Sequence, residues 1–355
     1  MAMTHLLKKF VLAAASIVIC FLLLEIGARL ARGKPLTYWP NFVETRISVI
    51  KSVYPTQHDP LLGWIPKAGD YTDANYWGKS LVILEDGIRG NGKGVRKEGK
   101  PLILAVGDSF TFGAEVADEE TWPATLERLS GARVLNGGVF AYGLDQTVLR
   151  AERLAAIFHP DVIVVSFIPD NVNRTERAVR TGASKPYFDV VGGRLELRNT
   201  PVPFLDPGAK DIGRFRRIFG HSFFVDGMMR RLKLDSFWYL GDWENVRVHR
   251  KGADVACLLM SRLAELAARQ HLTVVLLAQH PAALRDTEPP ESEKTVACAA
   301  ANGLPVLDLY GHLRDLALSD PARFRSFSGL HMTAGGNRFV AETVYGFLKE
   351  KGFIP

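Results

Sequence analysis

A serine and a histidine that lie far apart in the sequence occupy positions where they could act together as nucleophile and base. Ser109 follows Gly107 and Asp108, directly after the apolar run PLILAV that ends at Val106. A serine at the point where a strand turns into a helix lies beside backbone N–H groups and the positive end of the helix dipole, which stabilise an oxyanion. The same residues also suit a purely structural role, with Ser109 capping the helix and Asp108 in a tight turn.

His331 ends the run Ser328-Gly329-Leu330-His331, just before the last expected helix of the chain. Histidine titrates near neutral pH, so an imidazole close to Ser109 could take the hydroxyl proton as a general base. A helix-capping role is the structural alternative. The other eight of the nine histidines are scattered without the spacing of paired metal ligands, and we therefore expect neither a metal site nor a cofactor.

The body of the chain alternates between strands and helices. Continuous apolar runs predict buried parallel strands, and runs with helical periodicity predict the helices that cover them. The expected strands are 101–106, 133–135, 161–167, 272–278 and 304–307, and the expected helices are 119–130, 144–158, 253–269 and 333–349. This order predicts a three-layer α/β/α sandwich around a five-stranded parallel sheet. Ligands bind beyond the carboxyl ends of such strands, where Ser109 stands.

Four segments in the expected order resemble the motifs of the SGNH, or GDSL, hydrolase superfamily of esterases and acyl-group transferases. Ser109 in Gly-Asp-Ser fills the nucleophile position, and His331 fills the base position of the D-x-x-H motif, continued by GLHMTAGGNRFVA. Val134–Gly143 (VLNGGVFAYG) resembles the second motif and Val164–Arg174 (VVSFIPDNVNR) the third. The resemblance covers 107–337 and implies the flavodoxin-like fold of that superfamily, with Ser109 and His331 as catalytic residues.

The acid of the D-x-x-H motif is replaced in this sequence. Ser328 stands where the family has an aspartate, which fixes the tautomer of the histidine and stabilises the imidazolium. Asp308, at the end of the last expected strand, is a candidate substitute acid. Otherwise a backbone carbonyl could orient His331, so that Ser109 and His331 would work as a dyad.

The oxyanion donors that the resemblance implies are also altered. The glycine of the second motif corresponds to Ala141, whose N–H could still donate, with Gly138 as the alternative donor. The asparagine of the third motif corresponds to Asp170, and Asn171 stands next to it. An ionised aspartate cannot donate a hydrogen bond to an oxyanion, so either Asn171 serves through a shifted loop or this donor is lost.

The resemblance leaves two functions open. The first is a serine O-acyl esterase or acyltransferase. Membrane-anchored proteins that resemble this family often act on acyl groups of envelope polysaccharides, which suggests an acylated glycan as the substrate. The second is a non-catalytic carbohydrate-binding protein on the same scaffold, which the three altered positions favour. Because Ser109 and His331 are both retained, we expect the enzyme.

The composition limits the possible partners. The 355 residues carry a formal net charge of +6, with 47% hydrophobic and 23% charged residues, a mixture that excludes a disordered chain and a polytopic membrane protein. Residues 1–34 hold five Lys and Arg and one Glu, a net +4, so the remaining residues carry only +2. A nucleic-acid-binding protein needs its basic residues gathered on the folded body, and we expect no nucleic-acid partner.

An uncharged apolar stretch, Phe10–Leu24, continues with weak polarity to Ala28 and approaches the ~20 residues needed to span a bilayer. The sequence after it offers no good cleavage site, which favours an uncleaved signal anchor over a cleaved signal peptide. Basic residues flank the stretch on both sides, so the orientation rests on the inferred role of the domain. We expect a cytoplasmic tail at 1–9, a single transmembrane segment at 10–28 in the inner membrane, an extended tether at 29–98 that packs on the domain, and a hydrolase-like domain at 99–355 on the periplasmic or extracytoplasmic side.

The expected domain carries an insertion at about 174–251. FDVVGGRLEL within it predicts a β-hairpin that turns at Gly192-Gly193, and a basic, aromatic stretch follows (RFRRIFGHSFF, then MMRRLKLDSFWYLGDW). That stretch could bind sugar rings and anionic groups or rest on anionic lipid headgroups. We favour a third interpretation, an amphipathic helical lid with its charges in water. Cys257 and Cys298 lie on expected helices and are expected to be buried thiols rather than a disulfide.

Overall fold

The structure is a computed structural model of the chain, and it describes residues 2–52, 55–72, 78–92, 99–205, 211–281, 287–327, 329 and 331–355. The chain forms two compact units. One unit comprises Met1–Ser52 and Asp206–Glu244, and the other comprises Val53–Leu205 and Asn245–Pro355. The second unit contains the predicted sheet and is called the hydrolase-like unit below.

The centre of the hydrolase-like unit is a parallel sheet of five strands in the order β14-β13-β7-β5-β6. The strands are β5 (Leu102–Val106), β6 (Arg133–Asn136), β7 (Val162–Phe167), β13 (Thr273–Ala278) and β14 (Val306–Asp308). All four neighbouring pairs are parallel. The predicted α/β fold with five parallel strands is therefore confirmed. β5 and β7, which lie at the middle of the sheet, are buried along almost their whole length, as their continuous apolar sequences predict.

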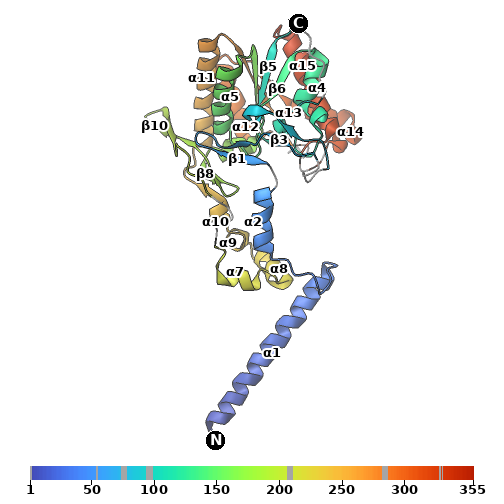
Figure 1. The fold of residues 1–355 in the computed structure, drawn as a ribbon, viewed down its shortest axis with the longest axis vertical. Helices are drawn as coiled ribbons and strands as arrows, with labels where there is room; N and C mark the ends of the chain where they lie inside the picture. Colours follow the sequence, from blue (N-terminus) through green and yellow to red (C-terminus); the bar gives the residue numbers. More distant parts are fainter. Residues whose placement is uncertain are drawn as a thin grey trace. The chain divides into compact units, whose positions relative to one another are not determined.

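Helices cover both faces of this sheet (Figure 1). One core contains α5 (Leu144–Phe158), α11 (Gly252–Gln270) and α12 (Pro290–Ala301), and the other contains α4 (Trp122–Ser130), α13 (Leu309–Ser319) and α15 (Ala334–Glu350). The short helix α14 (Pro321–Ser326) precedes the loop to α15. The helix predicted at 119–130 begins later, because Asp118–Glu120 forms a 3-10 turn and Thr121 then caps α4 by accepting from the N–H of Ala124.

The segment predicted as a tether contributes its second half to the hydrolase-like unit. Its strands are β1 (Thr56–Asp59), β2 (Gly63–Pro66), β3 (Gly69–Asp70) and β4 (Val82–Ile83), followed by the short turn Glu85–Gly87. Asp59 accepts two hydrogen bonds from Arg153 of α5, at 2.6 and 2.9 Å. The indole of Trp64 donates to the carbonyl oxygen of Phe140, and the Tyr142 hydroxyl donates to that of Trp64. These contacts fix the segment to the loop that carries the second motif.

The predicted insertion divides between the two units. The hairpin is confirmed: β10 (Tyr187–Val191) pairs antiparallel with β11 (Arg194–Arg198), and Gly192 and Gly193 make the turn with positive φ angles. A second small sheet joins β8 (Arg177–Arg180), β9 (Ala183–Ser184) and β12 (Asn245–Arg247). These strands belong to the hydrolase-like unit, whereas the basic, aromatic stretch between them belongs to the other unit.

The first unit combines the N-terminus with that stretch. Its helices are α1 (Ala2–Ala31), α2 (Phe42–Ser52), α7 (Gly213–Phe219), α8 (Phe223–Arg231), α9 (Asp235–Trp238) and α10 (Gly241–Glu244). A small core, with Trp238 fully buried at its centre, joins Val43 of α2 to Val225 of α8. Leu7–Ala31 of α1 is long and apolar enough to cross a membrane. The basic, aromatic stretch therefore packs with the N-terminal helices of this unit.

The prediction of buried thiols at Cys257 and Cys298 is wrong, because the two residues form a disulfide. Cys257 lies on α11 and Cys298 on α12, and their Cα atoms are 5.1 Å apart. The two helices pack side by side in the same layer, so positions 41 residues apart in the chain face each other. Cys20, on α1, is a free thiol and is exposed.

Candidate active site

Ser109 opens the short helix α3 (Ser109–Phe112), directly after β5. Asp108 caps this helix by accepting from the N–H of Phe110. Only glycine fits at position 107, because the backbone there passes close to Thr111 of α3. A Cβ at this position would lie 2.2 Å from the hydroxyl oxygen of Thr111. The strand therefore turns at once into the helix and places the Ser109 side chain at the carboxyl edge of the sheet, where it is 6% exposed.

His331 lies against Ser109, although 222 positions separate them. Its Nε2 is 2.9 Å from the Ser109 hydroxyl oxygen, which is hydrogen-bond distance. His331 stands two residues before Thr333, the N-cap of α15, and its ring packs edge-on against Phe110 with centroids 5.4 Å apart. This contact is the arrangement of a nucleophilic hydroxyl and its general base.

The other ring nitrogen of His331 faces a carboxylate that the sequence reasoning missed. Nδ1 lies 3.5 Å from Oε1 of Glu115, on the loop after α3. Nδ1 is buried and has no hydrogen bond, so the approach is at ion-pair distance rather than bonding distance. Glu115 has a φ angle of 70°, in the left-handed region that non-glycine residues seldom adopt. One signal was available: an acidic residue only six positions after Ser109, in a chain whose D-x-x-H motif has lost its usual acid.

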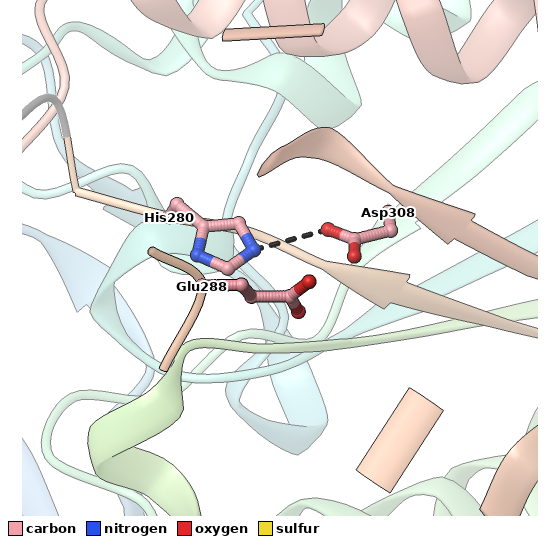
Figure 2. A group of neighbouring side chains, drawn as sticks. All are labelled: His280, Glu288 and Asp308. Atoms are coloured by element: carbon pink, nitrogen blue, oxygen red, sulfur yellow. Dashed lines mark hydrogen bonds and ion pairs between the residues drawn. The ribbon is translucent and has the colours of Figure 1, made fainter. Parts of the chain in front are cut away.

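Asp308 does not meet His331, contrary to the prediction that it could replace the missing acid. Its carboxylate accepts a hydrogen bond from the N–H of Tyr310 at the start of α13 and pairs with Nε2 of His280 at 3.0 Å. Figure 2 shows the His280 ring directed at Asp308, with Glu288 beside it. His280 follows β13, the neighbouring strand, and it takes the carboxylate because the two strand ends are adjacent. Ser328 lies outside the described residues.

His280, Glu288 and Asp308 also form a cluster whose ligand-type atoms all lie within 4.8 Å of one another. Burial and the nearby charge of Asp308 raise the pKa of Glu288. Burial alone would raise the pKa of Asp308 as well, but the hydrogen bonds from His280 and Tyr310 outweigh it and lower that pKa. The hydrogen bond from His280 occupies one carboxylate oxygen of Asp308, and Glu288 lies beside this pair.

The third motif places Asn171 in a structural network. Its amide donates to the carboxylate of Asp108 at 2.9 Å and to the carbonyl oxygen of Tyr142 at 3.2 Å, so both amide hydrogens are used. The Asn171 side-chain oxygen accepts from the N–H of Ile168, and the residue is fully buried. Arg174 donates to the same oxygen of Asp108. The amide therefore supports the turn that carries Ser109 and is not directed to an oxyanion.

Asp170, at the position of the family's asparagine, is held as an anion. It pairs with Arg174 at 2.8 Å and with Arg180 at 3.8 Å. Burial works to raise its pKa, but the two guanidinium groups outweigh burial, and the pKa is lowered. An ionised carboxylate offers no hydrogen to an oxyanion. The interaction explains why an aspartate is stable here, beside two arginines.

The second motif contains one glycine that is required for packing and one alanine whose N–H is a candidate oxyanion donor. A Cβ at Gly138 would lie 2.2 Å from the backbone nitrogen of Phe112, so only glycine fits, and its N–H donates to the side chain of Asn136. Ala141 adopts a left-handed conformation with φ 60°. Within the described residues, neither the N–H of Ala141 nor that of Ser109 has a hydrogen-bond acceptor.

A pocket of about 260 Å³ opens beside the imidazole, on the side of Glu115. Its lining is mostly polar or small, with Lys79, Glu115, Glu120 and Thr333 among the side chains that face it. Pockets for drug-sized ligands begin at about 300 Å³, so this one suits a small polar group next to the base.

Comparisons with known proteins give structural likenesses only. No family model and no curated protein matches the sequence. Among solved structures, the chain is similar to the lipase/acylhydrolase from Enterococcus faecalis, with 14% identity and a TM-score of 0.38 over 72% of this chain and 97% of the other. It is also similar to an acetylxylan esterase from Geobacillus stearothermophilus, with 13% identity and a TM-score of 0.40 over 73% and 96%. Both are ester-cleaving enzymes by name, the class that the motifs resemble, but TM-scores of this size are too low to carry weight for this chain.

Proposed function

We propose that this chain is an SGNH-type serine enzyme that cleaves or transfers ester-linked acyl groups. The observation that carries the proposal is the 2.9 Å contact between Nε2 of His331 and the hydroxyl of Ser109. A capping histidine or a capping serine has no need of that partner. The carbohydrate-binding alternative does not require it either, because a site that only holds a glycan gains nothing from a base against the hydroxyl.

The reaction follows from this contact. The Ser109 oxygen bonds to the ester carbonyl carbon while its proton passes to Nε2 of His331. The carbonyl oxygen becomes an oxyanion, and the proposed donors to it are the N–H groups of Ser109 and Ala141, which have no acceptor among the residues that the structure describes. When the intermediate collapses, the alcohol leaves with the proton from Nε2. Water or a sugar hydroxyl then attacks the acyl-serine, gives its proton to Nε2, and restores the Ser109 hydroxyl.

Glu115 acts in this scheme as a positioning residue. Its carboxylate faces Nδ1, so it favours the tautomer that carries hydrogen on Nδ1 and leaves Nε2 free to accept the serine proton. It also stabilises the imidazolium formed after proton transfer. The family places this acid three residues before the histidine, whereas here it comes from the loop that follows the nucleophile.

Three features support an acylated glycan of the cell envelope as the substrate. The pocket next to His331, at about 260 Å³ and lined mostly by polar or small residues, suits part of a polar carrier rather than a fatty acyl chain. The Cys257–Cys298 disulfide is typical of proteins in an oxidising compartment, outside the cytosol. The apolar helix α1 would hold the enzyme at the membrane, so we propose a single-pass protein with its hydrolase-like unit on the extracytoplasmic side.

The decisive experiment is labelling of the intact protein with a serine-directed fluorophosphonate, followed by mass mapping. We expect one adduct, on the peptide that contains Ser109, and none in Ser109→Ala. Ser319→Ala is the matched control, because Ser319 is exposed and its hydroxyl bonds only within its own helix. Absence of any adduct on the folded wild-type protein would contradict the proposal and favour the carbohydrate-binding alternative.

A further inference from the structure

Residues 211–244 of the first unit, called the collar below, expose large apolar side chains. Phe215, Ile218 and Phe237 are 43%, 68% and 52% exposed, and Leu232 and Leu234 are exposed as well. Phe215 and Ile218 are three residues apart and share one face of α7. Phe237 lies next to this helix, because the guanidinium of Arg216 on α7 covers its ring at 4.5 Å. Exposed apolar side chains that gather in this way mark an interaction surface on a protein.

The collar contacts α1 inside the segment that is apolar enough to cross a membrane. Phe21 packs edge-on against Phe219 of α7 and Phe224 of α8, with ring centroids 6.2 and 6.1 Å apart. The expected transmembrane segment ends at Ala28, seven residues after Phe21. At 1.5 Å per residue, Phe21 then lies about 10 Å below that end. Helices that lie in a membrane interface bury their apolar faces by about 5–10 Å, and α7 and α8 are therefore at interfacial depth.

A buried carboxylate with several partners connects α1 to the collar. The Glu25 carboxylate accepts from the Ser222 hydroxyl at 2.7 Å and from the N–H groups of Phe223 and Phe224, which begin α8. It also pairs with Arg29 at 2.6 Å, and both side chains are almost fully buried. Ionisable groups near a membrane are stable when they are paired in this way. This network fixes the collar to the helix at the level where α1 would leave the hydrocarbon.

The exposed charge of the collar is mainly basic. Asp226 is buried and paired with Arg32 and Arg230, so it presents no carboxylate to solvent. The exposed basic residues of the collar beside the apolar side chains include Arg214, Arg217, Arg231 and Lys233. Of these, Arg217 pairs with the exposed Asp211 at 3.0 Å. Nearby, Trp39 is 61% exposed and lies against the Arg29 guanidinium, which is typical of aromatic residues at a membrane interface.

We propose that the collar is a membrane-docking surface, which lies in the headgroup layer of an anionic bilayer with Phe215, Ile218 and Phe237 in the acyl boundary. Basic side chains then meet lipid phosphates, and the apolar face is covered by lipid rather than by water. The proposal rests on α1 as a membrane anchor and is independent of the catalytic chemistry. It assigns to the insertion a role in seating the enzyme on the bilayer.

The test measures the depth of single nitroxide labels on the full-length protein in lipid nanodiscs. In a Cys20→Ala background that keeps the disulfide, Ile218→Cys reports the collar, and Leu318→Cys, which is 75% exposed on α13, is the matched exposed position of the hydrolase-like unit. We expect the ratio of oxygen to aqueous nickel collisions to be several-fold higher at Ile218 than at Leu318. We also expect the double substitution Arg214→Glu/Arg217→Glu to lower the collision ratio at Ile218 in discs that contain phosphatidylglycerol.

The outcomes separate the collar from the anchor. Equal ratios at Ile218 and Leu318, or protection of Ile218 from both reagents as in a protein–protein contact, would overturn the proposal. Equal collision ratios at Ile218 in discs with and without phosphatidylglycerol would refute the proposed contacts between the basic side chains and lipid phosphates. Val18→Cys checks the anchor itself, since a water-exposed label at this position would refute the transmembrane helix and not the collar alone.

Discussion

The position of Glu115 leads to the sharpest prediction about catalysis. Replacing it with glutamine keeps the shape of the side chain and removes its charge. The Nδ1–Oε1 distance of 3.5 Å corresponds to an attraction of about 1 kcal/mol in bulk water and about 5 kcal/mol at an effective dielectric constant of 20. Because the carboxylate is 37% exposed, solvent screens part of this energy, and we take about 1–3 kcal/mol for the lost stabilisation of the imidazolium.

That energy corresponds to a fall in kcat of roughly 5- to 150-fold for Glu115→Gln, since about 1.4 kcal/mol is a factor of ten in rate. The midpoint of thermal unfolding should stay near the wild-type value, because glutamine keeps the shape of the side chain. The assay is steady-state hydrolysis of a chromogenic acetyl ester, together with the rate of fluorophosphonate labelling at Ser109. Both rates should fall by a similar factor.

A second variant tests whether the lower kcat comes from the lost carboxylate or from damage to the loop. Restoring the family's acid by Ser328→Asp in the Glu115→Gln background should recover part of kcat if the missing function is a carboxylate near His331. A kcat within a factor of two of wild type in Glu115→Gln alone would refute the reasoning and leave Ser109 and His331 to work as a dyad.

Three further predictions concern the framework of the site. Cys298→Ser should lower the free energy of unfolding by about 2–4 kcal/mol, because the disulfide closes a separation of 41 residues, and denaturant titration with and without reductant checks this. Asn171→Ala should cost about 2–4 kcal/mol of stability by chemical denaturation, as expected of a buried network residue, whereas an oxyanion donor would lose rate without stability. Burial works to raise the pKa of Asp59, but Arg153 and the backbone N–H groups outweigh it and lower the pKa below 3.8. The carboxylate therefore stabilises the fold fully above the usual pKa of an aspartate, and this stabilisation is lost as the pH falls through the lowered pKa. Asp59→Asn should lose about 1–3 kcal/mol at neutral pH and progressively less as the solution is acidified, in urea titrations across pH.

Most of the fold could be predicted because its signals are local. A run such as 161–167 is apolar at every position but two, and such runs form buried parallel strands wherever helices cover both faces. The contact between Ser109 and His331 was also predictable, because both follow the rule that site residues stand at the carboxyl edge of a parallel sheet.

The features that sequence reasoning missed depend on distances between elements. The pairing of Cys257 with Cys298 requires that two helices present facing positions, which periodicity alone does not reveal. Glu115 belongs to an acidic run that continues into the first turn before α4, where acidic residues ordinarily serve a helix N-terminus. The packing of 211–244 with the N-terminal helices depends on Glu25, the acidic residue of α1, whose partners lie almost two hundred positions away.

The unusual backbone of Glu115 is sustained by a buried arginine. A left-handed conformation costs a non-glycine residue roughly 1–2 kcal/mol, and such strain persists only where the surroundings over-determine it. Arg89 is 1% exposed and donates to the carbonyl oxygens of Phe112 and Val116, on either side of Glu115. Its own backbone N–H bonds to the end of β6. The acid that faces His331 is thus positioned from the sheet through Arg89, not by an unconstrained loop, and a carboxylate held in this way can replace one at position 328.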